Sequence, residues 1–469
     1  MPCAPFDHTV ILGAGPAGLM AGHTLAAAGR SVTILERAPA VGGLSGSRSF
    51  RAASGEYRFD YGGHRFITAN PELLALVERL LGDDLLVAER SSVIRFRGRT
   101  YEYPLALGNL LRTAPPALIA GALRDLARIA LRPHPRDASF ADWIESRFGT
   151  TLYRAFFEGY TRKLWGIDPR HLSSDWADQR ISLVDLRDVA RRLLPWTPRT
   201  PRTYARRYRY PRTGFGLLFQ RLAERFVEAG GELLLGAEVR ELVVRDGRIA
   251  TVGARTDAGW RRLTPDHVIS TLPMPDLVRM TGGDSKLRFR GLRFLNLVMD
   301  LPDVSPYTWQ YLSDPEIAAT RLQEPRRRSP HMAPPGRTSI MLEIPCDPGD
   351  ALWTMSDADL MQRGLADLDR LGVDVRRATG EHFTTRAATA YPFMDLDYVA
   401  ERRRAIAWLS RLSNLSLCGR QGTFRYVFSD TAMEMGMTVA RSLIESPHER
   451  PDVLEYRNEP TVIEAESIA

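Results

Sequence analysis

The stretch HTVILGAGPAGLMAGHTLAAAGRSVTILER at residues 8–37 constrains the fold more than any other part of the sequence. It reads as an apolar strand that ends at Leu12, a glycine-rich turn, a helix to about Ala28, and a second strand that ends at Glu36. A strand, a helix and a second strand in this order form a parallel βαβ unit. The stretch therefore predicts an α/β fold with a Rossmann-type nucleotide-binding domain.

The glycines of the turn have separate physical tasks in such a unit. Gly13 permits the tight turn, Gly15 lets the backbone approach a pyrophosphate, and Gly18 lets the helix pack closely on the strand. Pro16 and Ala17 open the helix, whose first free N–H groups would face the phosphate charge. The turn therefore predicts binding of a dinucleotide.

Two further features follow the second strand. Glu36 lies 23 residues after the first of these glycines, close to the usual spacing for an acid that accepts ribose hydroxyls, and Arg37 comes next. Gly42 and Gly43, followed by Leu44, form a second flexible turn that can line the same pyrophosphate. A surface loop is the alternative interpretation of this second turn.

Later segments predict further pieces of the same domain. Phe219, Leu222 and Phe226 recur at helical spacing, and an apolar strand follows them. Asp246-Gly247 between two apolar runs predicts a hairpin, and DHVISTLP predicts a buried strand. The C-terminal part of the chain adds one more strand and a helix that begins near Asp430.

The composition excludes several classes of protein. The chain has 469 residues, 44% of them hydrophobic and 25% charged, which is ordinary for two or three soluble domains. The formal charge of +7 is modest and the basic residues are spread along the chain, so nucleic-acid binding is not indicated. All basic residues except Lys163 and Lys286 are arginine, which can make forked contacts with diphosphates.

Neither a metal site, a disulfide framework nor a membrane span is expected. Cys3, Cys346 and Cys418 are too few and too scattered for a metal or disulfide motif, which fits a reducing cytoplasm. The N-terminus lacks the pattern of a signal peptide. The longest apolar run, Ala114–Leu123, is too short to span a membrane. Its helical spacing predicts an amphipathic helix packed on a neighbour, with an apolar face of Leu118, Ala122, Leu126 and Ile129.

Six motifs spread over nearly the whole chain carry a resemblance to a known family. They are FDYGGHRF at 59–66, LYRAFFEGYTRKLWG at 152–166, QRIS at 179–182, TRLQE at 320–324, ATAYPFMDL at 388–396 and CGRQGTFRY at 418–426. In this order they resemble UDP-galactopyranose mutase and its wider set of flavoprotein relatives, the amine oxidase and protoporphyrinogen oxidase superfamily. The resemblance implies that the dinucleotide is FAD.

The resemblance also implies FAD contacts outside the glycine motif. The backbone of Val239 would contact adenine, and Gly63 with His64 would lie against the isoalloxazine ring. The helix that begins near Asp430 would direct its N-terminus at the ring and favour negative charge there. The remaining residues implied at the cofactor are Gly419, Arg420, Thr431 and Ala432.

A substrate site on the inserted segments is implied as well. The residues implied in catalysis are His64, Trp165, Arg180, Arg420 and Tyr426, and those implied in substrate binding are Phe156, Tyr160, Thr161, Lys163 and Arg321. The aromatic residues would hold a nucleotide base and the sugar, with Arg180 reaching the diphosphate from a mobile loop. Each guanidinium can donate charge-assisted hydrogen bonds to phosphate oxygens.

Other interpretations of these residues stay open. Trp165 lies about 140° around the helix from Tyr160, so it need not belong to the core, although packing at a helix end is the alternative. Arg180 is alternatively a surface or ion-paired arginine, and His64 a structural histidine of the GGH turn. The run Arg326–Arg328 is expected to be a solvated loop.

Two reactions are compatible with the resemblance. The first is isomerisation of a nucleotide-diphosphate sugar between pyranose and furanose forms, with covalent catalysis by N5 of the reduced flavin. The alternative is an FAD-dependent oxidoreductase of the amine oxidase, alcohol oxidase or desaturase type. Ile344 follows Glu343 where the mutases have a tyrosine that grips the diphosphate, and this departure favours the alternative.

The order of the motifs predicts the domains. A discontinuous FAD-binding domain is expected from residues 1–105, 205–285 and 400–446. An inserted helical domain at 106–204 would carry the helix that contains Tyr160 and Trp165, which we call the site helix. A mixed β-sheet substrate domain would span 286–399. Residues 447–469 are polar without a pattern and are expected to form a loose tail. We expect a cytoplasmic enzyme that acts on a small molecule, with a homodimer as one assembly it could form.

Overall fold

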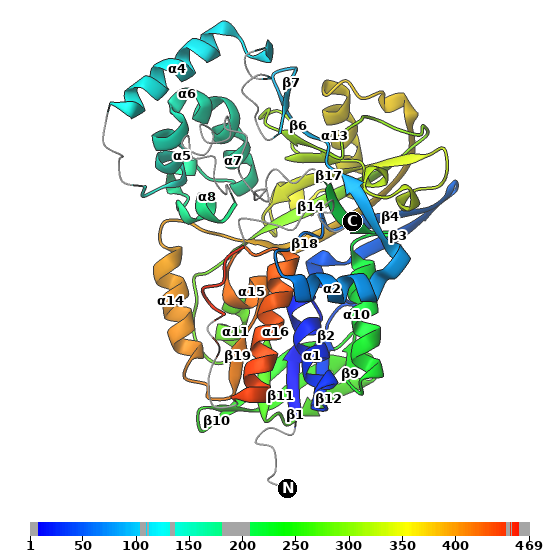
Figure 1. Cartoon of the computed structure of the whole chain (residues 1–469), viewed down its shortest axis with the longest axis vertical. Coiled ribbons are helices and arrows are strands. Elements are labelled where there is room, and N and C mark those ends of the chain that lie inside the picture. The colour runs from blue at the N-terminus through cyan, green and yellow to red at the C-terminus, as the bar shows by residue number, and fades with distance from the viewer. Residues whose placement is uncertain are drawn as a thin grey trace.

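A computed structural model describes residues 8–103, 109, 112–131, 137–180, 207–446, 451 and 453–458 of the chain. Figure 1 shows a parallel sheet among helices at one end of the molecule, and a helical body beside a second large sheet at the other end. Among the described helices, none combines the length and apolar character that crossing a membrane requires. Within the same residues, no three His, Cys, Asp or Glu side chains lie where they could share a metal ion.

The parallel sheet follows the sequence prediction closely. Its strands lie in the order β19-β13-β1-β2-β9, and every neighbouring pair is parallel. The strands are β1 (His8–Leu12), β2 (Ser31–Glu36), β9 (Glu232–Leu235), β13 (His267–Ser270) and β19 (Leu415–Leu417). The predicted ends at Leu12 and Glu36 are confirmed. Because the strands come from three separate parts of the chain, the discontinuous Rossmann-type fold is also confirmed.

Helix α1 (Pro16–Ala27) lies at the centre of this half. It packs against α10 (Gly216–Glu228) and against the long helix α16 (Ser429–Glu445), as Figure 1 shows. Phe219, Leu222 and Phe226 of α10 are fully buried, as their helical spacing predicted. The other helices of this half are α2 (Pro71–Leu81), α11 (Met274–Met280), α14 (Tyr398–Leu409) and α15 (Gly419–Thr423).

Short antiparallel sheets complete the same half. The three-stranded sheet contains β10 (Glu238–Arg245), β11 (Arg248–Thr256) and β12 (Gly259–Leu263), and the two-stranded ones pair β3 (Ser47–Ala52) with β4 (Gly55–Asp60) and β5 (Leu85–Glu89) with β8 (Arg207–Pro211). The predicted hairpin at Asp246-Gly247 is confirmed. Both turn residues have positive φ, 49° and 69°, which suits the tight turn of a two-residue hairpin.

The second large sheet has seven strands in the order β18-β14-β17-β16-β15-β6-β7. They are β6 (Ser92–Phe96), β7 (Arg99–Glu102), β14 (Phe289–Met299), β15 (Trp309–Leu312), β16 (Arg321–Gln323), β17 (Thr338–Cys346) and β18 (Ala378–Pro392). Helices α12 (Ala351–Thr354) and α13 (Asp357–Arg370) lie in the same part of the sequence. The sequence assigned residues 92–102 to the nucleotide-binding domain, whereas β6 and β7 extend this sheet by pairing with β15.

The helical body contains the predicted site helix. Its elements are α4 (Pro116–Ala130), α5 (Phe140–Phe148), α6 (Thr150–Leu152), a π-helical turn (Tyr153–Phe157), α7 (Glu158–Trp165) and α8 (Asp175–Arg180). Helix α7 ends where Gly166 adopts the left-handed conformation, with φ 70°, and its N–H closes the last turn on Arg162 O. The site helix therefore ends directly after Trp165.

The C-terminal residues are more ordered than the sequence suggested. We call residues 453–458 the C-terminal clasp, because they pack back onto the nucleotide-binding half. Val453 is buried in its core, and Tyr456 packs against the same core and exchanges a hydrogen bond with Thr438. The expectation of a loose tail is therefore wrong for these residues, while residues 459–469 lie outside the described part.

Candidate active site

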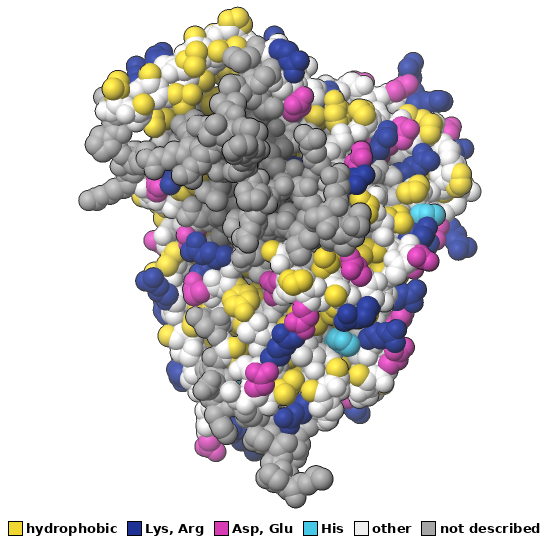
Figure 2. Space-filling view, viewed as in Figure 1, with side chains coloured by type: hydrophobic (Ala, Val, Ile, Leu, Met, Phe, Trp, Pro, Cys, Tyr) yellow, Lys and Arg dark blue, Asp and Glu magenta, His cyan; other side chains and the backbone are white. Residues whose placement is uncertain are grey.

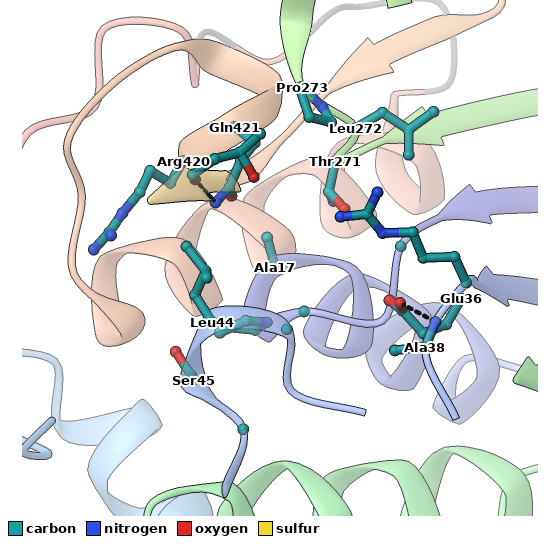
Figure 3. Close-up of a pocket in the computed structure, with 18 of the residues that line it drawn as sticks. Ala17, Glu36, Ala38, Leu44, Ser45, Thr271, Leu272, Pro273, Arg420 and Gln421 are labelled. Atoms are coloured by element: carbon teal, nitrogen blue, oxygen red, sulfur yellow. Dashed lines mark hydrogen bonds between the residues drawn. The ribbon is translucent and has the colours of Figure 1, made fainter. Parts of the chain in front are cut away.

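A cavity of about 510 Å³ opens above the parallel sheet. Its lining comes from the turn after β1, the turn after β2, the start of β10, the end of β13, the end of β18, and the segment around α15 and the start of α16. Figure 3 shows Glu36 and Arg420 at opposite ends of this pocket, with Ala17 and Thr271 between them. The cavity is therefore elongated and crosses the carboxyl ends of the parallel strands, where nucleotides bind in such folds.

The first glycine turn has the geometry that a diphosphate needs. Gly13 has φ 104°, and a side chain there would overlap the hydroxyl of Thr271. A side chain at Gly18 would overlap the carbonyl oxygen of Gly13. At Gly15, in contrast, an added Cβ would have no neighbour within 4 Å, so this glycine borders open space. The first turn of α1 carries no acidic residue, which leaves its free N–H groups to attract an anion.

Glu36 lies at the other rim of the glycine turn. Its two carboxylate oxygens accept hydrogen bonds from the N–H groups of Ala14 and Ala38, both at 2.8 Å. These bonds fix the carboxylate at the cavity wall while leaving further lone pairs for ribose hydroxyls. Arg37 and Val239 line the same end of the cavity.

The second glycine turn packs directly on the first. Gly42 has φ 97° and donates its N–H to Ala14 O at 2.8 Å. Gly43 lies so close that a side chain there would stand 3.5 Å from the Cα of Gly15. Gly43 and Leu44 line the cavity, so a free surface loop, the alternative interpretation, does not describe this turn.

The predicted cofactor residues divide into two groups. Those that line the cavity are Gly13, Gly15, Pro16, Ala17, Glu36, Arg37, Gly43, Leu44, His64, Val239, Gly419, Arg420 and Ala432. Those outside its lining are Gly18, Gly42, Gly63, Asp430 and Thr431. Gly18 and Gly42 shape the two turns from behind, and Asp430 and Thr431 are buried in the first turn of α16. That each residue contacts FAD stays a prediction.

Sequence reasoning missed one wall of the cavity, which follows β13. Thr271 donates its hydroxyl hydrogen to Leu12 O at 2.7 Å, and Leu272 and Pro273 continue the wall. Because β13 is parallel to β1 and adjacent to it, its carboxyl end must open onto the same site. The predicted strand DHVISTLP contained the signal that could have identified these residues.

His64 lies at the end of the cavity near Arg420. Its ring stacks on Phe215 with 5.1 Å between centroids, and Nε2 lies 3.0 Å from Tyr61 O. Burial lowers the pKa of His64, and the nearby Arg420 and Arg328 lower it further against the opposing effect of Asp60. A neutral imidazole is therefore favoured at neutral pH.

Arg420 and Tyr426 lie on one segment, which consists of α15 and the residues that follow it. We call this segment, residues 419–428, the site loop. Two nitrogens of Arg420 donate to Val427 O, at 2.9 and 2.7 Å, and a third donates to Ala390 O at 3.2 Å. The guanidinium carbon also lies 4.7 Å from the centre of the Tyr426 ring. The site loop thus holds this cation in a fixed position at the cavity wall.

Five aromatic residues surround the site loop, and we call them the aromatic cluster: Trp165, Trp176, Tyr391, Phe393 and Tyr426. Trp176 packs edge to face against both Trp165 and Tyr426, with centroid distances of 4.8 and 5.1 Å. Tyr391 lies 5.7 Å from Tyr426 and 6.0 Å from Trp165. The structure therefore brings Trp165 and Tyr426 to one region. The expectation that Trp165 need not be core is wrong, since it is 1% exposed in a hydrophobic core.

Arg321 forms the polar side of this region. It pairs with Glu343 at 3.0 Å, where the two side chains are 12% and 2% exposed. Burial alone would lower the pKa of Arg321, but Glu343, together with Tyr391, Tyr160 and Tyr311, raises it well above its usual value. A charged guanidinium therefore lies among three tyrosines.

A buried network extends from this ion pair. Gln323 donates to Glu343 and accepts from Arg328, which is 3% exposed. The expectation of a solvated loop at 326–328 is therefore wrong for Arg328. Gly62 and Gly63 pack on the same network, because side chains there would approach Glu343 and Gln323 within 3.1 and 3.0 Å. The GGH turn thus connects His64 to Arg321.

Ile344 faces away from this network. It lies on β17 directly after Glu343, and successive side chains of a strand point to opposite faces. Ile344 accordingly packs in the hydrophobic core between the seven-stranded sheet and α13, and is 1% exposed. A tyrosine at position 344 of this strand would not reach Arg321, so this departure from the mutase pattern is not a change in the site.

The remaining predicted substrate residues lie on the site helix and the turn before it. Tyr160 packs edge to face on Tyr311 at 5.9 Å, and Phe156 packs on Tyr101 at 5.0 Å. Thr161 is buried. Lys163 turns away, because its ammonium donates to Asp314 O and Ile317 O, at 2.9 and 3.0 Å. This placement gives Lys163 a structural task instead of the predicted substrate contact.

Arg180 is the last residue of α8, and its side chain lies outside the described residues. Three other predicted residues have a buried donor that is free. Within the described part of the chain, Tyr160 Oη, Trp165 Nε1 and Arg321 Nε are buried without a hydrogen-bond partner, as are atoms of several other residues. Buried donors are usually paired in folded proteins, so these three are available to a ligand or to water.

The C-terminal clasp holds the site loop from behind. Asn458 donates to Tyr426 O at 2.9 Å and accepts from Phe428 N at 2.7 Å and from the Thr431 hydroxyl at 3.2 Å. Glu455 forms ion pairs with Arg402 and Arg425, both 7% exposed. Sequence reasoning missed these contacts because the residues of the clasp show no pattern.

Sequence comparison places the chain in a family. Residues 16–444 match the family described as flavin containing amine oxidoreductase. Putrescine oxidase of Kocuria rosea is 46% identical over 71 residues, which cover 15% of this chain and 14% of that protein. Phytoene dehydrogenase of Streptomyces griseus is 26% identical over 422 residues, covering 78% of this chain and 79% of that protein.

Solved structures support the fold. Reduced UDP-galactopyranose mutase has a TM-score of 0.79 at 22% identity, covering 93% of this chain and 95% of that one. Putrescine oxidase bound to putrescine has a TM-score of 0.63 at 17% identity, covering 93% and 99%. Cyclohexylamine oxidase from Brevibacterium oxydans IH-35A has a TM-score of 0.63 at 14% identity, covering 95% and 100%. With a family match over most of its length and a cavity whose turns fit a diphosphate, this chain belongs to the flavin containing amine oxidoreductase family, and its cofactor is FAD.

Proposed function

We propose that this FAD-dependent protein isomerises a nucleotide-diphosphate sugar. The observation that carries the proposal is the set of three buried donors without partners, Tyr160 Oη, Trp165 Nε1 and Arg321 Nε. Buried donors without partners favour a ligand rich in oxygen acceptors, such as a sugar or a phosphate.

The charge of the site supports an anionic ligand. Arg321, Arg328 and Arg420 lie in the buried network or at the cavity wall, and Glu343 is the acid paired with Arg321. A positively charged site repels the ammonium group of an amine and attracts a diphosphate. The positive charge of the site therefore favours a sugar nucleotide over an amine as the substrate.

When bound in its reduced state, FAD would supply a nucleophilic N5 nitrogen for the anomeric carbon of the sugar. The protein residues would then bind and orient the substrate. Arg420, together with Arg180 and Arg321, would neutralise the charge that develops on the departing diphosphate. Tyr160 would pack on the nucleotide base, and Trp165 and Tyr426 would border the sugar. Because the neutral form of His64 is favoured, the positive charge of the site would come from the arginines.

The second candidate is an FAD-dependent oxidoreductase. The relative that supports it is phytoene dehydrogenase, at 26% identity over 78% of this chain. The aromatic cluster is an apolar wall that could also hold an unsaturated substrate. In this case oxidised FAD would accept a hydride from the substrate, and no nucleotide diphosphate would be needed.

An anaerobic assay separates the two candidates. Enzyme reduced with dithionite would be mixed with UDP, GDP and dTDP sugars, and the products would be followed by chromatography and the flavin by absorbance. Repeated isomerisation without flavin reoxidation is expected. Turnover only with oxidised flavin, and no spectral change with any nucleotide diphosphate, would refute the proposal.

Arg180→Ala sharpens the same experiment. We expect nucleotide-diphosphate binding to weaken at least about tenfold, because one charge-assisted hydrogen bond contributes about 1.5–3 kcal/mol. The FAD spectrum should stay unchanged. Arg170→Ala is the matched control, since this exposed arginine pairs with Glu145 on the surface and should leave binding unchanged.

A further inference from the structure

Helix α4 has an apolar surface on two sides. Its inner side holds buried Ala122 and half-buried Leu118 against the helical body, as the amphipathic pattern predicted. Its outer side is also apolar, and Leu123 and Leu131 there are 62% and 85% exposed. In the described part of the chain these are the two most exposed large hydrophobic side chains. The apolar surface of this helix is therefore wider than the face that packs on the protein, and part of it has no neighbour in the described chain.

The exposed residues form one continuous stripe. At 100° per residue, the side chains of Ala120, Leu123, Ala127 and Leu131 fall within an arc of about 80°. We call these four residues the outer stripe of α4. Figure 2 shows hydrophobic side chains gathered along this helix at the outer end of the molecule, with basic side chains beside them. The stripe is remote from the FAD cavity, whose lining includes no residue of α4.

Positive charge flanks the stripe. Arg124 and Arg128 follow it around the helix, and their side chains are 63% and 67% exposed. Both lie near the one carboxylate of Asp125, at 3.7 and 3.8 Å, which balances one of the two charges. Asp125 is the single acidic residue between positions 103 and 136, where the sequence has five arginines. Its carboxylate is buried and accepts hydrogen bonds from the N–H and hydroxyl of Thr151, at 2.8 and 2.6 Å. The outward charge of this helix is therefore positive.

We propose that the outer stripe of α4 binds the surface of an anionic lipid bilayer. Leucines would enter the boundary between headgroups and acyl chains, while Arg124 and Arg128 would contact lipid phosphates. A helix with an apolar stripe beside arginines, lying at one end of the molecule, has the design of an interfacial helix. The protein would lie on the membrane without crossing it.

Charge decides against a second copy of the chain as the occupant. A two-fold symmetric contact through α4 pairs the same surface patch of both copies, so it would gather the Arg124 and Arg128 side chains of both copies at one interface. No exposed acid on this helix would compensate for that repulsion. Anionic lipid headgroups supply the missing counter-charge.

The test is co-sedimentation of the FAD-loaded protein with vesicles. The protein should bind vesicles that contain about one quarter phosphatidylglycerol more strongly than pure phosphatidylcholine vesicles, and added salt should weaken the binding. The double variant Leu123→Glu/Leu131→Glu should reduce the partition coefficient at least about tenfold. Arg124→Gln/Arg128→Gln should reduce it about 30-fold on anionic vesicles, and much less on neutral ones.

Val87→Glu is the matched control. Val87 is 56% exposed on β5, outside the helical body, so its replacement adds a charge without touching the stripe. FAD content and melting temperature verify that each variant is folded. Equal vesicle binding by the leucine variant and the wild type would overturn the proposal. So would a failure of the wild type to bind anionic vesicles, or a dimer in sedimentation velocity that the leucine variant abolishes without any vesicle binding.

Discussion

The FAD end and the substrate end of this molecule position their functional groups by different means. At the FAD end the backbone itself forms the site, and the key residues are those that have no side chain: Gly15 borders open space and Gly18 touches the carbonyl of Gly13. At the substrate end long side chains form the site, and each is held by a distant partner. Arg321 pairs with Glu343, and Gln323 connects Glu343 to Arg328.

The difference explains what evolution can change at each end. A side chain added at Gly18 or Gly42 meets backbone atoms, which cannot move aside. An arginine at the substrate end can be replaced if its partner changes as well. The FAD end should therefore respond to substitutions by losing its cofactor, and the substrate end by losing stability and ligand separately. The following predictions test this contrast.

Gly18→Ala should have the largest effect. The added methyl group overlaps the carbonyl oxygen of Gly13, so we expect destabilisation of about 4 kcal/mol or more, with loss of FAD. Gly15→Ala is the matched control, because its φ of −77° suits alanine and its Cβ has no protein neighbour. We expect that variant to melt like the wild-type apoprotein and to bind FAD at least about tenfold more weakly in a fluorescence titration. If the Gly15 variant bound FAD as tightly as the wild type, the pyrophosphate would not lie at this turn.

Arg321→Met should come next. It leaves Glu343 buried and charged without its partner, so the free energy of unfolding should fall by about 3–5 kcal/mol in urea denaturation. The double variant Arg321→Met/Glu343→Leu should recover most of this stability, because it removes both charges. It should not recover nucleotide-diphosphate binding. Recovery of both properties would mean that Arg321 serves only the fold.

Asn458→Ala should have an intermediate effect. It removes the acceptor of the buried Phe428 N–H and the donor to Tyr426 O, which should cost about 1–3 kcal/mol of stability. The visible circular dichroism of the flavin should change, since the site loop loses its support. Asn458→Asp keeps the acceptor and loses the donor, so its stability should lie between those of the wild type and Asn458→Ala. If the flavin signal were unchanged in both variants, the C-terminal clasp would have no effect on the geometry of the site.

The smallest effect at neutral pH should come from Lys163. Burial lowers its pKa from 10.5 to about 8, so between these values the unfolded chain holds a proton that the folded one has released. Stability should then rise with pH in this window, by at most about 1.4 kcal/mol per pH unit, and stay flat below pH 8. Lys163→Met should abolish the rise. A slope that persists in this variant would assign the titration to another group.

The glycine turns could be predicted because their signals are local. Gly13 and Gly42 must adopt positive φ, and Glu36 follows at a spacing set by one helix and one strand. The burial of Trp165 could not be predicted, since Trp176, Tyr391 and Phe393 come from separate parts of the sequence. Helical spacing describes the position of a side chain on its own helix, and it says nothing of what another segment places beside it. The same reason hid the burial of Arg328.

The orientation of Ile344 gives a related lesson. The resemblance linked position 344 to the diphosphate site, but the period of a strand sends positions 343 and 344 to opposite faces of the sheet. Glu343 joined the polar network and Ile344 the core. Reading the alternation of TSIMLEIPC along with the motif would have separated the two residues.

The contact between Glu455 and two arginines bears on how shortened versions of this protein should be designed. The last long helix ends at Glu445, which invites an experimenter to cut the chain just after it. Such a cut would delete the carboxylate that lies between Arg402 and Arg425, and it would leave two guanidiniums side by side with nothing to balance them. A deletion series aimed at better crystals should therefore keep residue 458.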